Sequence, residues 1–279
     1  MSADPSEPIW NRPEPGARGA SLSRDKIAEA ALNIADTEGF EAVSMRRLAS
    51  DLDVGTMTLY HYVRSKRELL GLMEDGIMGE LLVPDDELPD DWREALTELA
   101  VRTYEVFRRH SWALQALRGN EENGPNGMRH FEQSLAVTSR LGLDGREQLE
   151  LITLVDDYTL GVVQRQADAD AFADAAETFI EQIPDGVLEY FDALVESGEF
   201  PNIAGLAGSD DPLDTIRLLG SVFFDENRFR RGLERLLDGI EADLSRRSRS
   251  RRGARSPRAS QGRSQRQGSG RRAARTPRG

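Results

Sequence analysis

The 279-residue sequence contains no cysteine, only two lysines and only three histidines. Without cysteine there can be no disulfide framework, thiolate metal site or cysteine nucleophile. The longest nearly apolar stretch, 149–163, is interrupted by Asp156 and Asp157, so no segment reaches the length of a bilayer span. The acidic, proline-rich first 16 residues are the opposite of a secretory signal. We therefore expect a cytoplasmic protein.

Signatures of catalysis are also absent. The chain has no Gly-x-Ser-x-Gly turn, no glycine-rich phosphate loop and no His-Glu-x-x-His pair. Asp156 and Asp157 are adjacent in sequence, so a helix would point them about 100° apart, which suits no shared reaction centre. We expect no enzyme activity, no cofactor and no metal.

Charge is distributed unevenly along the chain. The net charge is −13, yet residues 245–279 hold 13 arginines and no acidic residue, while residues 68–244 carry a net −25. Residues 21–67 hold seven charges of each sign. The two ends are therefore the parts of the chain that can approach phosphate.

Apolar residues recur at helical spacing through most of the sequence, and no strand pattern of useful length appears. Ser23, Ser44 and Ser65 are expected N-caps, Gly39 is an expected helix end, and Ser65 with Glu68 forms a capping box. The predicted helices span 23–38, 44–52, 56–63, 66–82, 92–108, 111–118, 127–141, 146–166, 170–182, 184–197 and 212–244. The predicted fold class is all-α.

The stretch 44–66 (SMRRLASDLDVGTMTLYHYVRSK) is the most informative segment. Two short helices around a tight turn at 53–55 are typical of a helix-turn-helix. The face of the second helix that does not pack is predicted to display Thr56, Met57, Thr58, Tyr60, His61 and Tyr62, which can contact phosphates or base edges. Basic residues flank this face: Arg46, Arg47, Arg64, Lys66 and Arg67. Alternatively, Tyr60 and Tyr62 pack inside and the charges are merely solvated.

Residues 44–49 (SMRRLA), 58–63 (TLYHYV) and Lys66 resemble the DNA-binding domain of the tetracycline-repressor (TetR) family. Residues 157–161 and 229–240 resemble helices further along tetracycline-type repressors, so the resemblance covers 22–244. It implies that Leu59 lies in the core. It also implies DNA contacts from Ser44, Arg46, Thr56, Met57, Thr58, Tyr60, His61, Tyr62 and Lys66.

Dimerisation is expected for a physical reason as well. One subunit offers few basic groups, and each neutralised phosphate adds to the affinity, so two subunits are needed. The resemblance implies that helices 146–166 and 212–244 of two chains form a four-helix bundle, on an inverted-repeat operator. Gly232 and Gly239 would let a partner helix approach closely. Alternatively, these two helices belong to an intramolecular core.

The resemblance further implies a repressor released by a small molecule, which we expect to be hydrophobic or moderately polar. Candidate ligand-binding residues are the aromatic and polar groups among apolar ones: Trp92, Tyr104, Phe107, His110, Trp112, Gln115, His130, Phe131, Tyr158 and Gln164. Each could instead be a core residue. Tetracycline repressors carry a magnesium-binding histidine where this chain has 117–120 (LRGN), so we expect neither tetracycline nor a metal. The alternative is a DNA-binding regulator without an effector, controlled by a partner protein.

These observations divide the chain into five segments. They are a disordered arm (1–20), a helix-turn-helix domain (21–66), a connecting helix (67–83), an effector-binding and dimerisation domain (84–244) and a disordered arginine-rich tail (245–279). The tail has almost no apolar side chains and cannot form a core. It either grips DNA non-specifically or folds back on the acidic middle of the chain.

Overall fold

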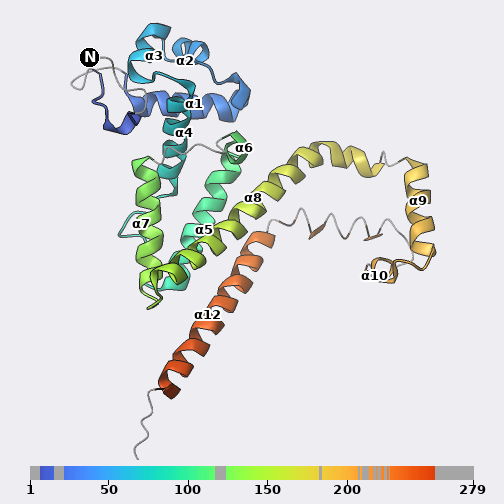
Figure 1. Ribbon diagram of the computed structural model, residues 1–279. Coiled ribbons are helices and arrows are strands. Elements are labelled where there is room, and N and C mark those ends of the chain that lie inside the picture. The colour runs from blue at the N-terminus through green and yellow to red at the C-terminus, as the bar shows by residue number, and fades with distance from the viewer. Residues whose placement is uncertain are drawn as a thin grey trace, which may run out of the picture. The chain divides into compact units, whose positions relative to one another are not determined.

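The structure is a computed structural model, shown in Figure 1. It describes residues 7–15, 22–116, 124–181, 184–206 and 227–254, with seven further positions between 207 and 226. Every regular element in these ranges is a helix, and none of the described residues forms a strand, so the predicted all-α fold is confirmed. No helix within the described ranges is long and apolar enough to cross a membrane.

Three helices form an N-terminal head (Figure 1): α1 (Arg24–Glu38), α2 (Met45–Asp51) and α3 (Thr56–Tyr62). Two of the predicted serine caps begin α1 and α2. Ser23 Oγ accepts the N–H of Lys26, and Ser44 Oγ accepts the N–H of Arg47, both at 3.2 Å. Gly39 ends α1 with a φ of 88°, a backbone conformation that glycine adopts without strain.

The helix α4 (Lys66–Leu81) begins at the predicted cap, where Ser65 Oγ accepts the N–H of Glu68 at 3.2 Å. In a capping box the Glu68 carboxylate would accept the N–H of Ser65 itself. Here it accepts the N–H of Arg64, one residue earlier, at 2.7 Å. The same carboxylate oxygen is paired with Arg12, which draws it away from the standard position.

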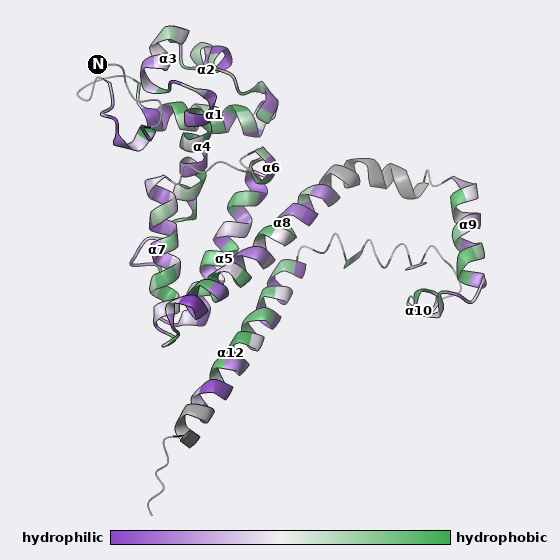
Figure 2. Ribbon diagram, viewed as in Figure 1, coloured by the Kyte–Doolittle hydropathy of each residue, from purple (hydrophilic) through white to green (hydrophobic). Residues whose placement is uncertain are grey.

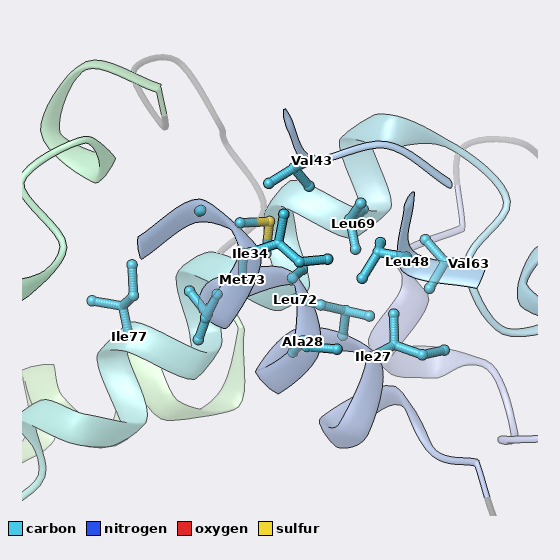
Figure 3. Close-up of a cluster of buried hydrophobic side chains, with 14 of the residues drawn as sticks. Ile27, Ala28, Ile34, Val43, Leu48, Val63, Leu69, Leu72, Met73 and Ile77 are labelled. Atoms are coloured by element: carbon cyan, nitrogen blue, oxygen red, sulfur yellow. The ribbon is translucent and has the colours of Figure 1, made fainter. Parts of the chain in front are cut away.

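The head and α4 share one hydrophobic core (Figure 3). Ile27 from α1, Leu48 from α2, Val63 from the end of α3 and Met73 from α4 have no exposed surface. Shortening one such side chain to alanine costs about 2–5 kcal/mol. The connecting helix α4 is therefore also a structural part of the head.

Residues 7–15 pack onto the head, although the sequence predicted a disordered arm over 1–20. They include a single 3-10 turn, η1 (Ile9–Asn11), in which Ile9 is fully buried and Trp10 contacts the core. The three prolines of this segment dominate its composition and hid the apolar Ile9–Trp10 pair. Residues 1–6 and 16–20 of the predicted arm lie outside the described residues.

The next helices are α5 (Trp92–Arg109), α6 (Ala113–Ala116), α7 (Pro125–Ser139) and α8 (Gly145–Glu181). Here α5 packs against α8, and α7 packs against both α4 and α5. Hydrophobic and hydrophilic residues alternate along α5 and α7 (Figure 2), as expected of helices with one packed and one exposed face. The acidic loop 84–91 is tied to α7, because Arg140 Nη1 donates to the carbonyls of Pro89 and Asp90, both at 2.9 Å.

Several predicted bounds differ from the structure. The helices predicted at 146–166 and 170–182 are one 37-residue helix, α8. Residues 167–169 (ADA) contain neither glycine nor proline, and alanine has the highest helix propensity, so nothing there ends the helix. The predicted loop 198–211 contains a short helix, α10 (Pro201–Ala204), which follows α9 (Asp185–Glu196).

The helix predicted over 212–244 is interrupted. Its described positions 214, 215, 218, 221 and 222 are helical, Asp225 and Asn227 are not, and the last helix, α12 (Arg228–Ala254), begins after them. It continues ten residues into the segment predicted as a disordered tail. An ion pair at 2.6 Å from Arg247 Nε to Asp243 Oδ2, four residues apart on the helix, supports this continuation. The rest of the predicted tail, 255–279, lies outside the described residues, as do 117–120.

Candidate nucleic-acid interface

The outer face of α3 is an exposed row of side chains. The exposed residues are Met57 (73% exposed), Tyr60 (43% exposed), Thr58 and His61, with Thr56 partly buried at the start of the helix. On the opposite face, Leu59 is completely buried. A short helix anchored on one side and open on the other is the geometry of a helix that reads a DNA groove.

Tyr62 does not lie on that exposed row. Its side chain is only 7% exposed and belongs to the core of the head, so its predicted place on the displayed face is wrong. Helix geometry explains the difference. Tyr62 and Val63 follow Leu59 by three and four residues, and those positions share one face of a helix. Tyr62 therefore lies on the same buried face as Leu59.

Two arginines at the start of α2 differ in their surroundings. Arg47 forms ion pairs with Glu38 and Asp51, and these bonds lower the pKa of Glu38 and raise that of Arg47. Arg46, next in sequence, is exposed and has no ion pair with any described residue. Ser44 is exposed, and its hydroxyl accepts a hydrogen bond that caps α2. Arg46 is therefore the better placed of the two arginines to meet a phosphate.

The start of α4 adds a second basic group beside α3. Lys66 is exposed, and its ammonium lies 5.4 Å from the centre of the Phe40 ring, a cation–π arrangement. Arg64 and Arg67 are exposed on either side. Three cations within four residues lie immediately after the exposed row of α3, where the backbone of a bound duplex would pass.

The predicted ligand-binding residues do not surround a single cavity in the described residues. Tyr104 and Tyr158 both stack on Phe229 of α12, with ring centres 4.1 and 5.9 Å apart, and the Tyr158 hydroxyl donates to the Phe229 carbonyl at 2.9 Å. These aromatic residues join α5, α8 and α12 through packing. Gly232 belongs to the same contact, because a Cβ there would overlap the Tyr158 hydroxyl.

Gly232 thus faces a side chain of its own subunit, so the expectation that it lets a partner helix approach is wrong. The other candidates are spread more widely. Phe107 is buried and Trp92 is partly buried, Gln115 and Phe131 are exposed, and Gln164 bonds to Asp168 on the same helix.

His110 and Trp112 lie at the junction between the head and the following helices. His110 is buried, and its Nδ1 is 2.8 Å from Asp36 Oδ1 of α1, while its Nε2 is 3.1 Å from Glu80 Oε1 of α4. Trp112 Nε1 donates to the same Asp36 oxygen at 2.7 Å, and Arg109 pairs with Glu80.

A second link joins α4 to α7. Gly124 precedes α7 and has no side chain to cap it, and the carboxylate of Asp75 on α4 does so instead. Asp75 Oδ1 accepts the N–H of Asn126 at 2.7 Å and that of Gly127 at 3.3 Å. Burial raises the pKa of Asp75, while these two backbone bonds oppose that shift. Any side chain at position 124 would overlap the carboxylate.

One buried polar atom on α7 has no such partner among the described residues, and one carboxylate on α8 is partly buried. His130 Nδ1 is buried without a hydrogen bond, and burial lowers the pKa of this imidazole. On α8, burial raises the pKa of Asp156 to about 6, with a smaller contribution from the charge of Asp157. A buried polar atom without a hydrogen-bond partner, such as His130 Nδ1, is the kind of group that a bound molecule satisfies.

Together, the head and its helical continuation define a helix-turn-helix DNA-binding protein. Two family models match the chain: bacterial regulatory proteins, tetR family, over residues 27–73, and the tetracyclin repressor-like C-terminal domain over 83–244. The chain therefore belongs to the TetR family, a family of regulators rather than enzymes, and the predicted resemblance is confirmed.

Three similar proteins are informative. The HTH-type transcriptional repressor DrrR1 of Streptomyces coeruleorubidus is 34% identical over 248 residues, covering 86% of each chain. An HTH-type transcriptional regulator of Saccharopolyspora erythraea is 29% identical, over 57% of this chain and 67% of its own. The structure of the TetR family protein ActR of Streptomyces coelicolor with actinorhodin is 28% identical, with a TM-score of 0.58 over 80% of this chain and 97% of ActR.

Sequence reasoning missed the carboxylates that join the head to the following helices. Asp36, Asp75 and Glu80 are ordinary helix-surface residues by pattern, and their partners are 29 to 76 residues away in sequence. Only for Asp75 was there a signal: a helix starting at Gly124-Pro125 lacks a capping side chain of its own, so a cap had to come from elsewhere.

Proposed function

We propose that this protein is a cytoplasmic transcriptional repressor that binds an inverted-repeat operator as a homodimer and is released by a small molecule. The observation that carries the proposal is the exposed row on α3, with Met57, Thr58, Tyr60 and His61 outward and Leu59 fully buried behind them. Its DNA contacts would come from that row and from Thr56, Ser44, Arg46 and Lys66. Tyr62 would act through packing.

A dimer is supported by the outer face of α8. Leu154 is 46% exposed there, and Gly161, two turns further along, has no neighbouring atom within 4 Å of an added Cβ. Seven-residue spacing keeps both positions on one helix face, which a second α8 could cover. The two reading helices of such a dimer would enter successive major grooves about 34–36 Å apart. The symmetry of the dimer then requires an inverted repeat.

Release by a ligand is supported by the relatives and by the junctions of α4. ActR has been crystallised with actinorhodin and with (S)-DNPA. In this chain α4 belongs to the core of the head, and it is also bonded to α5 through Glu80 and to α7 through Asp75. A molecule that favours one arrangement of α5, α7 and α8 would therefore act on α4 and on the spacing of the two heads.

The decisive experiment selects binding sites from a pool of random duplexes with the full-length protein. The selected duplexes are then footprinted with the protein bound. We expect an inverted repeat protected over two successive major grooves. A single asymmetric site would contradict the dimeric docking, and no enriched site would contradict DNA recognition as a whole.

The ligand is tested by a thermal-shift screen of hydrophobic and moderately polar metabolites, followed by titration of the stabilising compounds against the protein–operator complex. We expect at least one such compound to weaken operator binding. If none does, effector control fails, and regulation by a partner protein takes its place.

A further inference from the structure

Residues 7–15, here called the N-terminal clasp, are held against the head by a buried side chain, an ion pair and hydrogen bonds to their backbone. Ile9 is fully buried in the core of the head, and Arg12 is 7% exposed. The clasp precedes the part of the chain that matches the TetR family model, which begins at residue 27.

One residue of α1 anchors the clasp backbone. Arg24 Nη1 donates to the carbonyl of Ile9 at 2.8 Å and to the carbonyl of Arg12 at 3.0 Å. The backbone N–H of Arg24 also donates to Glu14 Oε1 at 2.5 Å. Burial is the main cause that lowers the pKa of Arg24, and the nearby charge of Arg12 adds to it. The clasp thus has a fixed conformation against the first turn of α1.

The clasp contacts the residues that follow α3, the helix that carries the exposed row. Arg12 Nη2 lies 2.6 Å from Glu68 Oε2, and the two side chains are 6% and 14% exposed. The same oxygen of Glu68 accepts the N–H of Arg64 at 2.7 Å. Arg64 lies between Val63, which ends α3, and Ser65, which caps α4. Arg12 therefore holds, through Glu68, the backbone that connects the exposed row of α3 to Lys66.

We propose that Arg12 is a positioning residue for operator recognition, which fixes the turn 63–65 so that α3 and the cations at the start of α4 meet the duplex in one geometry. The inference rests on the proposed function. Arg12 itself is buried, so it contributes nothing by touching phosphate. Its effect is on the angle between the base-reading side chains and the phosphate-contacting side chains, and this angle matters for a specific site far more than for random DNA.

The test compares operator and scrambled duplexes for the full-length protein and for Arg12→Gln. We expect Arg12→Gln to weaken operator binding about tenfold, the size of effect expected within one hydrogen-bond network, while binding to the scrambled duplex stays within about twofold. Arg12→Lys keeps the charge and one donor and should recover part of the operator affinity. Equal loss on both duplexes would overturn the proposal, because it would indicate direct phosphate contact.

A double-mutant cycle checks that Arg12 acts through Glu68. Operator affinity is measured for Arg12→Gln, Glu68→Gln and the double variant, and we expect the double variant to be no weaker than Arg12→Gln alone. Additive losses would overturn the pathway through Glu68.

A purely structural role is separated by Ile34→Val, a buried change on α1 outside the clasp. At matched loss of thermal stability, Ile34→Val should keep its operator affinity. If Ile34→Val loses as much operator affinity as Arg12→Gln, the positioning role is wrong. It is also wrong if Arg12→Gln lowers thermal stability but leaves operator affinity unchanged. If the wild type itself selects no operator, the proposed function fails and the positioning role fails with it. Normal selection with an unaffected Arg12→Gln overturns the positioning role alone.

Discussion

The imidazole of His110 lies between the carboxylates of Asp36 and Glu80, 2.8 Å from the first and 3.1 Å from the second. The three residues come from the end of α5, from α1 and from α4. A single buried side chain therefore contacts both α1 and α4 from the end of α5. We expect a shift of α5 to act on α1 and α4 together.

We predict that His110→Gln uncouples the ligand from the DNA. Glutamine cannot bridge both carboxylates in the same way, while Trp112 and Arg109 continue to hold Asp36 and Glu80. Operator affinity without ligand should stay within a few-fold, but the factor by which a stabilising compound weakens operator binding should fall at least about fivefold. Fluorescence anisotropy with and without the compound measures this. Glu98→Gln, an exposed change on α5, is the control. If the compound weakens operator binding by the same factor in His110→Gln as in this control, the prediction is wrong.

We predict opposite effects of alanine at two glycines of α12. Gly232→Ala places a methyl group into the Tyr158 hydroxyl and should lower the free energy of unfolding by about 1–3 kcal/mol. Gly239→Ala meets no atom within 4 Å and should raise helix stability by up to about 1 kcal/mol. Urea denaturation measures both. Tyr158→Phe in the Gly232→Ala background should recover part of the loss, and no recovery would mean that the clash lies elsewhere.

The two tyrosines of α3 should behave differently towards DNA. Tyr60→Ala should weaken operator binding about tenfold without changing thermal stability, because Tyr60 is exposed on the row that would face the groove. Tyr62→Phe keeps the buried ring and should leave operator affinity unchanged. Electrophoretic mobility shifts and thermal melts of each variant measure the two properties. If Tyr62→Phe loses operator affinity, the Tyr62 hydroxyl contacts DNA and the prediction is wrong.

Lys66→Ala should act through charge. It removes one phosphate contact from each subunit, and the slope of log affinity against log salt should become shallower by about 0.9 per contact. Because this term does not depend on sequence, affinity for operator and scrambled duplexes should fall by similar factors. A fall confined to the operator would instead give Lys66 a role in reading sequence.

Asp156 should make stability depend on pH. Its pKa is about 6 in the folded chain, so between about pH 4 and pH 6 the folded state holds the proton more tightly than the unfolded state. The free energy of unfolding therefore falls as pH rises through this window. Asp156→Asn should be more stable than the wild type above pH 6, by about 2–3 kcal/mol, and equally stable near pH 4. Equal stability at pH 7.5 would mean that another group satisfies the carboxylate.

The fold class, the head and the reading helix were predictable because local signals agree there. Ser23, Ser44 and Ser65 are each followed by an apolar helical pattern, and all three cap the expected helix. Tyr62 failed because a pattern of polar and aromatic residues does not say which face a tyrosine takes. The position of Leu59 decides that, through the three-residue spacing of a helix.

The junctions could not be predicted, because they depend on residues that meet only after the helices have packed. His110, Asp36 and Glu80 are separated by up to 74 residues, and no local spacing connects them. The clasp was missed for a different reason. Its prolines predicted a disordered arm, but Ile9 is buried in the core of the head, and Arg24 donates hydrogen bonds to the carbonyls of Ile9 and Arg12.

Two carboxylates of α4, Glu68 and Asp75, determine where a chimera could be joined if the N-terminal head were exchanged with that of a relative. Glu68 belongs with Arg12 of the clasp, and Asp75 belongs with the start of α7. A chimera joined before Glu68 would leave Arg12 without its carboxylate, and one joined after Asp75 would leave α7 uncapped. A junction within the six residues between them, 69–74, keeps both pairs intact. Its buried side chains include Leu69, Leu72 and Met73, a set that tolerates substitution by apolar residues of similar volume.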